Sequence, residues 1–153
     1  MTTANAGGPI DVGEFDAAPP ADAAAELVPC CASRRWVSRL VKNRPYASLS
    51  RLSSASDGVL AALPWPDLLE ALPEHSAEHP YGAESRAAVG MLSMGAYRDR
   101  FGYAFVICSA GLTEAQVMVA LRSRLRNDPV AEREVVRAEL AKLVRLRLAS
   151  AFR

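Results

Sequence analysis

Apolar residues recur every three or four positions along most of the chain, which is the spacing typical of amphipathic helices. Helix-start signals stand in front of several of these segments, at Ser33, at Ser48, at Thr113 with Gln116, and at Asp128 with Pro129. The pattern predicts helices over residues 21–28, 34–41, 48–63, 67–72, 84–101, 113–126 and from 128 nearly to the last residue. We therefore predict one all-α domain, a single compact unit of seven to eight helices.

Three segments lack the helical pattern. Residues 1–14 are rich in Gly, Ala, Pro, Thr and Asp, so we predict a flexible N-terminal arm followed by the domain at 15–153. Residues 73–83 contain two prolines and both histidines, which makes this stretch the least helical connection. Residues 103–108 are predicted to form an extended, buried linker, because no second strand-like run exists to pair with them.

Composition supports helices and narrows the function. Alanine, the best helix former, occurs 28 times among the 153 residues. The 18 basic and 17 acidic residues give a net charge of +1, which offers no support for nucleic acid or an anionic membrane as partner. No apolar run approaches the roughly 20 residues of a membrane span. These properties favour a protein that binds a small molecule.

The chain contains few cysteines and histidines, the residues that most often bind metals or take part in redox chemistry. Cys30, Cys31 and Cys108 form an odd set with one adjacent pair, which is typical of reduced thiols in a cytoplasmic protein. We interpret all three as small buried hydrophobes. His75 and His79 lie four residues apart, but prolines interrupt their segment, so we expect no metal site. No glycine-rich phosphate-binding loop is present.

Two features could support chemistry. Val136, Leu140 and Leu143 form an apolar stripe on the last predicted helix, and the next position of this stripe is Arg147. From the residues alone, an arginine whose stem packs near a helix end is favoured over an anion-binding arginine. The histidines between helices are suited to proton transfer near neutral pH, with Glu84 opening the following helix.

Several motifs, in order, resemble one known family. The segment 97–108 (YRDRFGYAFVIC) is similar to an FG-x-x-F-x-IC motif, 121–128 (LRSRLRND) to LRxRLxND, and 146–148 to a closing LRL. In the first half, 30–36 (CCASRRW) and 44–46 (RPY) agree as well. From Phe15 to Phe152, the chain resembles 2-oxo-4-hydroxy-4-carboxy-5-ureidoimidazoline (OHCU) decarboxylases. The resemblance implies an all-α fold that works without a cofactor and is often dimeric, so a homodimer is an open expectation.

The resemblance also implies catalytic positions. Alignment without gaps places His75 on the family's catalytic histidine and Ser76 on the proline that follows it. A rival alignment uses His79 and Pro80 and needs an insertion. Alignment on Gly90 places Glu84 on a family serine. The same alignment puts Ala87 and Ala88 on the family's glutamate-glutamine pair, so that pair is missing here.

Substrate-binding positions follow in the same way. Arg147 matches the family's substrate-binding arginine, while Phe105 and Ile107 match residues whose backbone helps to hold the substrate. We therefore expect His75 and Glu84 to act in catalysis, and Arg147, Phe105, Ile107 and Ser76 to bind substrate.

Three functions remain open at this point. The first is OHCU decarboxylation to (S)-allantoin in urate breakdown, by a carboxy-lyase that needs no cofactor. The second is a repurposed relative that acts as a lyase or cyclase on another small polar substrate. The third is a non-catalytic binding protein. The missing pair favours the second over the first, whereas the nearly full-length resemblance favours the first.

Overall fold

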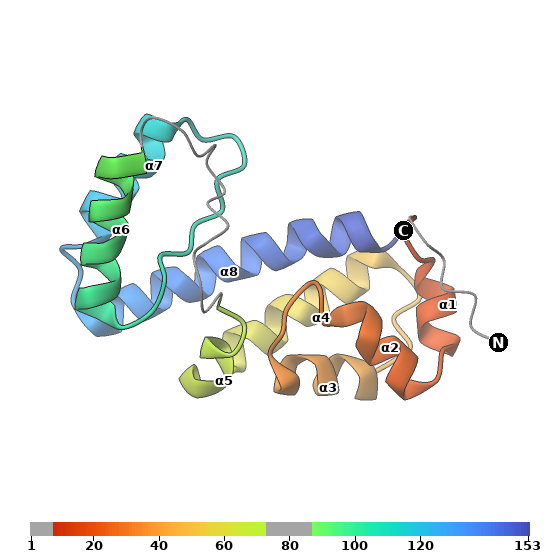
Figure 1. Cartoon of the computed structure of the whole chain (residues 1–153). Coiled ribbons are helices and arrows are strands. Elements are labelled where there is room, and N and C mark those ends of the chain that lie inside the picture. Colours follow the sequence, from red (N-terminus) through yellow and green to blue (C-terminus); the bar gives the residue numbers. More distant parts are fainter. Residues whose placement is uncertain (1–7, 73–86) are drawn as a thin grey trace. The chain divides into compact units, whose positions relative to one another are not determined.

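The computed structural model describes residues 8–72 and 87–153, and its regular structure in these ranges is helical (Figure 1). Its helices are α1 (Val12–Ala17), α2 (Pro20–Leu27), α3 (Arg34–Lys42), α4 (Leu49–Ala62), α5 (Trp65–Leu69), α6 (Ala87–Phe101), α7 (Glu114–Arg124) and α8 (Pro129–Ala151). The prediction of an all-α fold with seven to eight helices is confirmed. Within the same ranges, no helix combines the length and the apolar character needed to cross a membrane.

The predicted helix-start signals act as expected, because they depend on local chemistry. The Ser33 and Ser48 hydroxyls accept hydrogen bonds from backbone N–H groups in the first turns of α3 and α4. Thr113 and Gln116 form a complete capping box on α7. The Asp128 carboxylate accepts from the N–H groups of Val130 and Ala131 at 3.0 and 2.9 Å, which starts α8.

Close contacts divide the chain into two compact units, and α8 contributes to both. The first unit contains the residues up to Ala71 together with Ala141–Arg153, and the second contains Leu72–Leu140. In the first unit, α3 packs against α2, α4 and α5. Several large side chains in its core are fully buried, among them Trp36, Leu40, Leu52 and Leu60.

The start of the first unit differs from the sequence prediction. We predict an arm through residue 14, but α1 begins at Val12 and is capped by the Asp11 side chain. Ile10 pairs with Phe152 in an isolated parallel bridge, with an N–H···O distance of 2.9 Å from Ile10 to Ala151. Phe15 is fully buried and contacts the Phe152 ring edge-on at 5.1 Å between centroids. Packing against residues distant in sequence therefore stabilises a helix of only six residues.

In the second unit, α6 packs against α7. Gly102 ends α6 with a φ of +85°, a conformation that glycine adopts without the steric cost of a side chain. Residues 104–109 form neither a helix nor a paired strand, so the predicted absence of a partner strand is confirmed for this connection. Ala104, Val106 and Ile107 are buried in it.

The buried stripe of α8 differs from the predicted one. The sequence analysis extends Val136 and Leu140 through Leu143 to Arg147, but the buried residues that follow are Val144 and Leu148. Successive residues of a helix are rotated by about 100°. Arg147, one position before Leu148, is therefore exposed rather than aligned with the core.

Candidate active site

The structure describes three of the six residues predicted for the site. Arg147 belongs to the first unit, whereas Phe105 and Ile107 belong to the second. His75, Ser76 and Glu84 lie outside the described residues, and so do the alternatives His79 and Pro80. Each described part of the site is therefore considered by itself.

Arg147 lies on the last part of α8 with its side chain exposed. Its Nη1 atom donates a hydrogen bond to the backbone carbonyl of Cys30 at 3.2 Å. Cys30 follows α2 in a turn where the N–H groups of Cys30 and Cys31 both donate to the Leu27 carbonyl, at 2.9 and 3.2 Å. One nitrogen of the guanidinium is thus anchored to the main chain. The rest of its planar fork is suited to a carboxylate or carbonyl of a ligand.

The two thiols beside Arg147 are not nucleophiles. Cys30 and Cys31 are 1% and 2% exposed, as predicted for small buried hydrophobes. Burial raises the pKa of both thiols, to about 11 for Cys31, although the Arg147 guanidinium acts in the opposite direction. They therefore remain protonated at neutral pH. Cys108 differs from the prediction because it is only half-buried.

The extended segment that contains Phe105 and Ile107 shows an alternating pattern of backbone hydrogen bonds. The Val106 carbonyl accepts from Arg124 Nη1 at 2.6 Å, and the Cys108 N–H donates to a Glu139 carboxylate oxygen at 3.4 Å. The backbone groups of Phe105 and Ile107 form no hydrogen bond with any residue that the structure describes. The backbone hydrogen bonds of this segment thus fall on Val106 and Cys108, the residues that alternate with Phe105 and Ile107.

A buried charged network holds this segment, and the sequence analysis did not identify it. The Arg124 guanidinium donates from Nε to the Glu132 carboxylate at 2.6 Å, and these residues are 5% and 0% exposed. Glu132 also accepts from the Tyr97 hydroxyl at 2.7 Å and from the Asn127 side-chain amide at 3.0 Å. Burial, together with the hydrogen bond to Glu132, raises the pKa of Tyr97 well above its usual value. The network therefore contains one compensated ion pair and a neutral phenol.

A sequence signal for this network exists. Val117, Leu121 and Arg124 are spaced by four and three residues on α7, and all three are buried. An arginine on an apolar stripe is the same pattern that singled out Arg147. The pattern identifies a buried guanidinium on α7 but not on α8.

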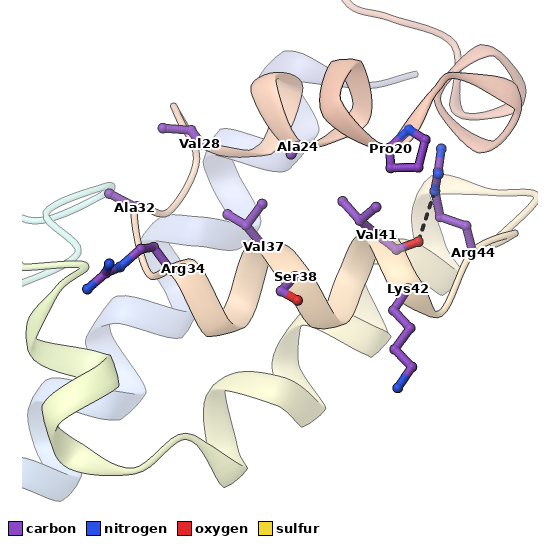
Figure 2. A pocket seen from close by; sticks show the side chains of 10 residues that line it. All are labelled: Pro20, Ala24, Val28, Ala32, Arg34, Val37, Ser38, Val41, Lys42 and Arg44. Carbon is purple, nitrogen blue, oxygen red and sulfur yellow. Dashed lines mark hydrogen bonds between the residues drawn. The ribbon is translucent and has the colours of Figure 1, made fainter.

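An open groove of about 640 Å³ lies between α2 and α3 (Figure 2). Small apolar side chains line it, including Ala24 from α2, Val28 directly after α2, and Val37 and Val41 from α3. Of the predicted site residues that the structure describes, Arg147, Phe105 and Ile107, none lines this groove. The described part of the predicted active site therefore lies outside this groove. Among the described residues, no cluster of three or more histidine, cysteine or carboxylate side chains could hold a metal ion.

Proteins of known activity resemble this chain in sequence. A curated relative from Arabidopsis thaliana, uric acid degradation bifunctional protein TTL, is 27% identical over 80% of this chain and 45% of its own length. The 2-oxo-4-hydroxy-4-carboxy-5-ureidoimidazoline decarboxylase of Amia calva is 38% identical over 34% of this chain and 30% of its own length. The chain thus spans less than half the length of both curated relatives.

Solved structures show the same fold. A crystal structure of (S)-allantoin synthase matches with a TM-score of 0.75 at 25% identity, over 95% of this chain and 54% of the other. OHCU decarboxylase crystallised in the presence of (S)-allantoin matches with a TM-score of 0.68 at 24% identity, over 81% of this chain and 94% of the other. The OHCU decarboxylase family model matches residues 16–77 and 76–149. The chain therefore belongs to the OHCU decarboxylase family, as its motifs predict.

Proposed function

We propose that this protein is a carboxy-lyase that converts the ureidoimidazoline OHCU to (S)-allantoin in urate breakdown and needs no cofactor. The observation that carries the proposal is the family match over residues 16–149, which includes both units. The relatives' printed activities, in uric acid degradation and OHCU decarboxylation, support the same reaction.

In this reaction the protein has to position the substrate and deliver one proton. The carbon–carbon bond to the carboxylate breaks, carbon dioxide leaves, and the bonding electrons move into the adjacent imine of the ring. A proton then adds to one face of the ring, which sets the configuration of the product. The substrate is its own electron sink, so the enzyme's task is orientation and selective protonation.

Residue roles follow from this division of work. Arg147 binds an anionic or carbonyl group of the substrate, supported by its exposed guanidinium anchored to Cys30. The backbone groups of Phe105 and Ile107, which form no hydrogen bond with a described residue, hold the ring. His75 orients the carboxylate-bearing centre and manages the proton. Ser76 assists in substrate binding, and Glu84 takes over part of the role of the missing glutamate.

A specific observation favours a second candidate function. The first turn of α6 contains no acidic residue, and it begins with Ala87 and Ala88. A family member without the expected glutamate-glutamine pair is suited to a different small polar substrate. The alternative is therefore a repurposed lyase or cyclase with the same fold.

The decisive experiment generates the substrate, the ureidoimidazoline, in the assay mixture itself. Urate oxidase and hydroxyisourate hydrolase generate the ureidoimidazoline from urate, this protein is added, and circular dichroism follows the appearance of one allantoin enantiomer. We expect rapid formation of the (S) form by the wild-type protein and its loss in His75→Ala. His79→Ala, in the rival position, is the matched control and should retain activity. Absence of any acceleration by the wild-type protein would contradict the proposal.

The same assay distinguishes the alternative. If Ala87→Glu produces activity that the wild-type chain lacks, the ancestral reaction has been lost and another substrate has replaced OHCU. The proposal also includes a homodimer, which sedimentation would test, and a cytoplasmic location, which the three unpaired cysteines support.

A further inference from the structure

We propose that Arg124 is a positioning residue, which fixes the backbone of Phe105 and Ile107 in the orientation that binds substrate. The inference rests on the proposed function, because it deepens the description of the same site. Arg124 itself is 5% exposed and acts through the segment that it holds.

The geometry of Arg124 joins three parts of the second unit. Its Nη1 atom donates to the Val106 carbonyl at 2.6 Å, between the two residues whose backbone is implicated in binding. Its guanidinium also lies over the Phe105 ring, with Cζ at 4.4 Å from the centroid. One side chain therefore contacts the extended segment at two adjacent residues.

Arg124 is itself held from the opposite side. Glu132 on α8 accepts from its Nε atom at 2.6 Å, and the Tyr97 hydroxyl on α6 donates to the same carboxylate oxygen at 2.7 Å. The Tyr97 ring packs edge-on against Phe105 at 5.2 Å between centroids. Residues from α6 and α8 thus fix the guanidinium, and the guanidinium fixes a segment that has no helix or sheet of its own.

This arrangement exceeds what stability requires. An irregular buried segment needs its polar groups paired, and solvent or a neutral donor could pair the Val106 carbonyl. A buried ion pair is an expensive way to do so, because both charges must be desolvated. What the charged fork adds is direction, since it determines which side of the segment the Phe105 and Ile107 groups face.

Arg124→Lys tests the proposal while keeping the positive charge opposite Glu132. A lysine has one ammonium group and cannot bond Glu132, bond the Val106 carbonyl and cover Phe105 together. We expect kcat on the ureidoimidazoline to fall about 10- to 100-fold, with a smaller change in KM, because a displaced binding group costs most at the transition state. Glu132→Gln, which loosens the guanidinium without removing it, should lower kcat about 3- to 10-fold.

Arg44→Lys is the matched control in the first unit. The Arg44 guanidinium also donates to backbone carbonyls, those of Phe15 and Ala18 at 2.7 Å, and lies 5.6 Å from the Phe15 ring centroid. Arg44→Lys should lower the melting temperature by an amount similar to Arg124→Lys. Its kcat per folded molecule should stay within about twofold of wild type. Equal kcat losses in the two variants, or unchanged kcat in Arg124→Lys, would overturn the proposal.

Amide NMR separates failure of this inference from failure of the proposed function. If the wild-type protein does not accelerate decarboxylation, the proposed function fails while the positioning role is still measured from the spectra. We expect the Phe105 and Ile107 amide signals to broaden or split in Arg124→Lys and to stay single in Arg44→Lys. Single, unshifted signals in both variants would refute the role of Arg124 whatever the activity. Should Arg124→Lys not fold, Glu132→Gln takes its place in both measurements.

Discussion

Arg124 and Arg147 show two different uses of a guanidinium. The charge of the buried Arg124 is compensated by Glu132, and its guanidinium donates hydrogen bonds to buried acceptors. A charge that is removed from water needs such partners. The exposed Arg147 uses one nitrogen to bond the Cys30 carbonyl. Only the second arrangement leaves a cation accessible to a ligand.

Removal of the Arg147 side chain should separate function from stability. Arg147→Ala is expected to lower kcat/KM for the ureidoimidazoline about 100-fold or more, the usual effect of removing one charged donor. Unfolding free energy should change by about 0.5 kcal/mol or less, because the side chain is exposed. Steady-state kinetics and urea denaturation measure the two effects.

Arg145→Ala is the neighbouring control. Arg145 is also exposed on α8 and pairs with Asp57, so its loss removes the same charge from the same helix. Turnover should remain near the wild-type value in this variant. Unchanged turnover in Arg147→Ala would remove that residue from the site.

At the residue scale, the sequence predicts which residue types are buried better than it predicts which face of a helix a given side chain occupies. Cys30 and Cys31 are buried as expected. The sequence pattern places Arg147 on the core face by continuing the stripe through Leu143, whereas the buried stripe passes through Val144. A stripe through Leu143 and one through Val144 and Leu148 fit the helical period almost equally well. Only packing against other helices determines which of these residues are buried.

Helix boundaries in this chain follow local signals wherever such signals exist. The Thr113–Gln116 capping box and the Asp128 cap start α7 and α8 at the predicted positions. The helix that sequence analysis missed, α1, has six residues and is stabilised by contacts of Phe15 with distant parts of the chain. A helix this short is not stable on its own in water, and hydrophobic periodicity over so few residues does not predict it.

The cap of α7 gives a prediction at this scale. Thr113→Ala removes the acceptor for the Gln116 N–H, which it now bonds at 3.1 Å. We expect a loss of about 1 kcal/mol in unfolding free energy, measured by chemical denaturation. Thr113→Ser retains the hydroxyl and should remain close to wild type. Equal stability of the alanine and serine variants would show that the cap contributes nothing.

For the whole molecule, the sequence predicted the fold through its family motifs rather than through physics alone. Periodicity indicates helices but not which of them pack together, so the division into two units could not be anticipated. The family model matches residues of both units, so each unit contains part of the family's sequence pattern.

Phe152 tests how strongly the first unit depends on the end of α8. It is 1% exposed and contacts Phe15, while its backbone pairs with Ile10. Phe152→Ala should destabilise the protein by about 3–5 kcal/mol, as for other buried aromatic residues. Leu146→Ala, at a site 48% exposed, is the control and should cost much less. A thermal melt of Phe152→Ala that matches wild type would contradict this assignment.

The alternation of backbone groups along 105–108 implies that the length of this segment is more constrained than its composition. Val106 and Cys108 bond to Arg124 and Glu139, whereas the alternating residues Phe105 and Ile107 form no backbone hydrogen bond with a described residue. Replacing a side chain here leaves that parity intact. Inserting or deleting a single residue reverses it, because each peptide group would exchange sides with its neighbour. Divergent relatives should therefore tolerate substitutions in this segment while keeping its residue count.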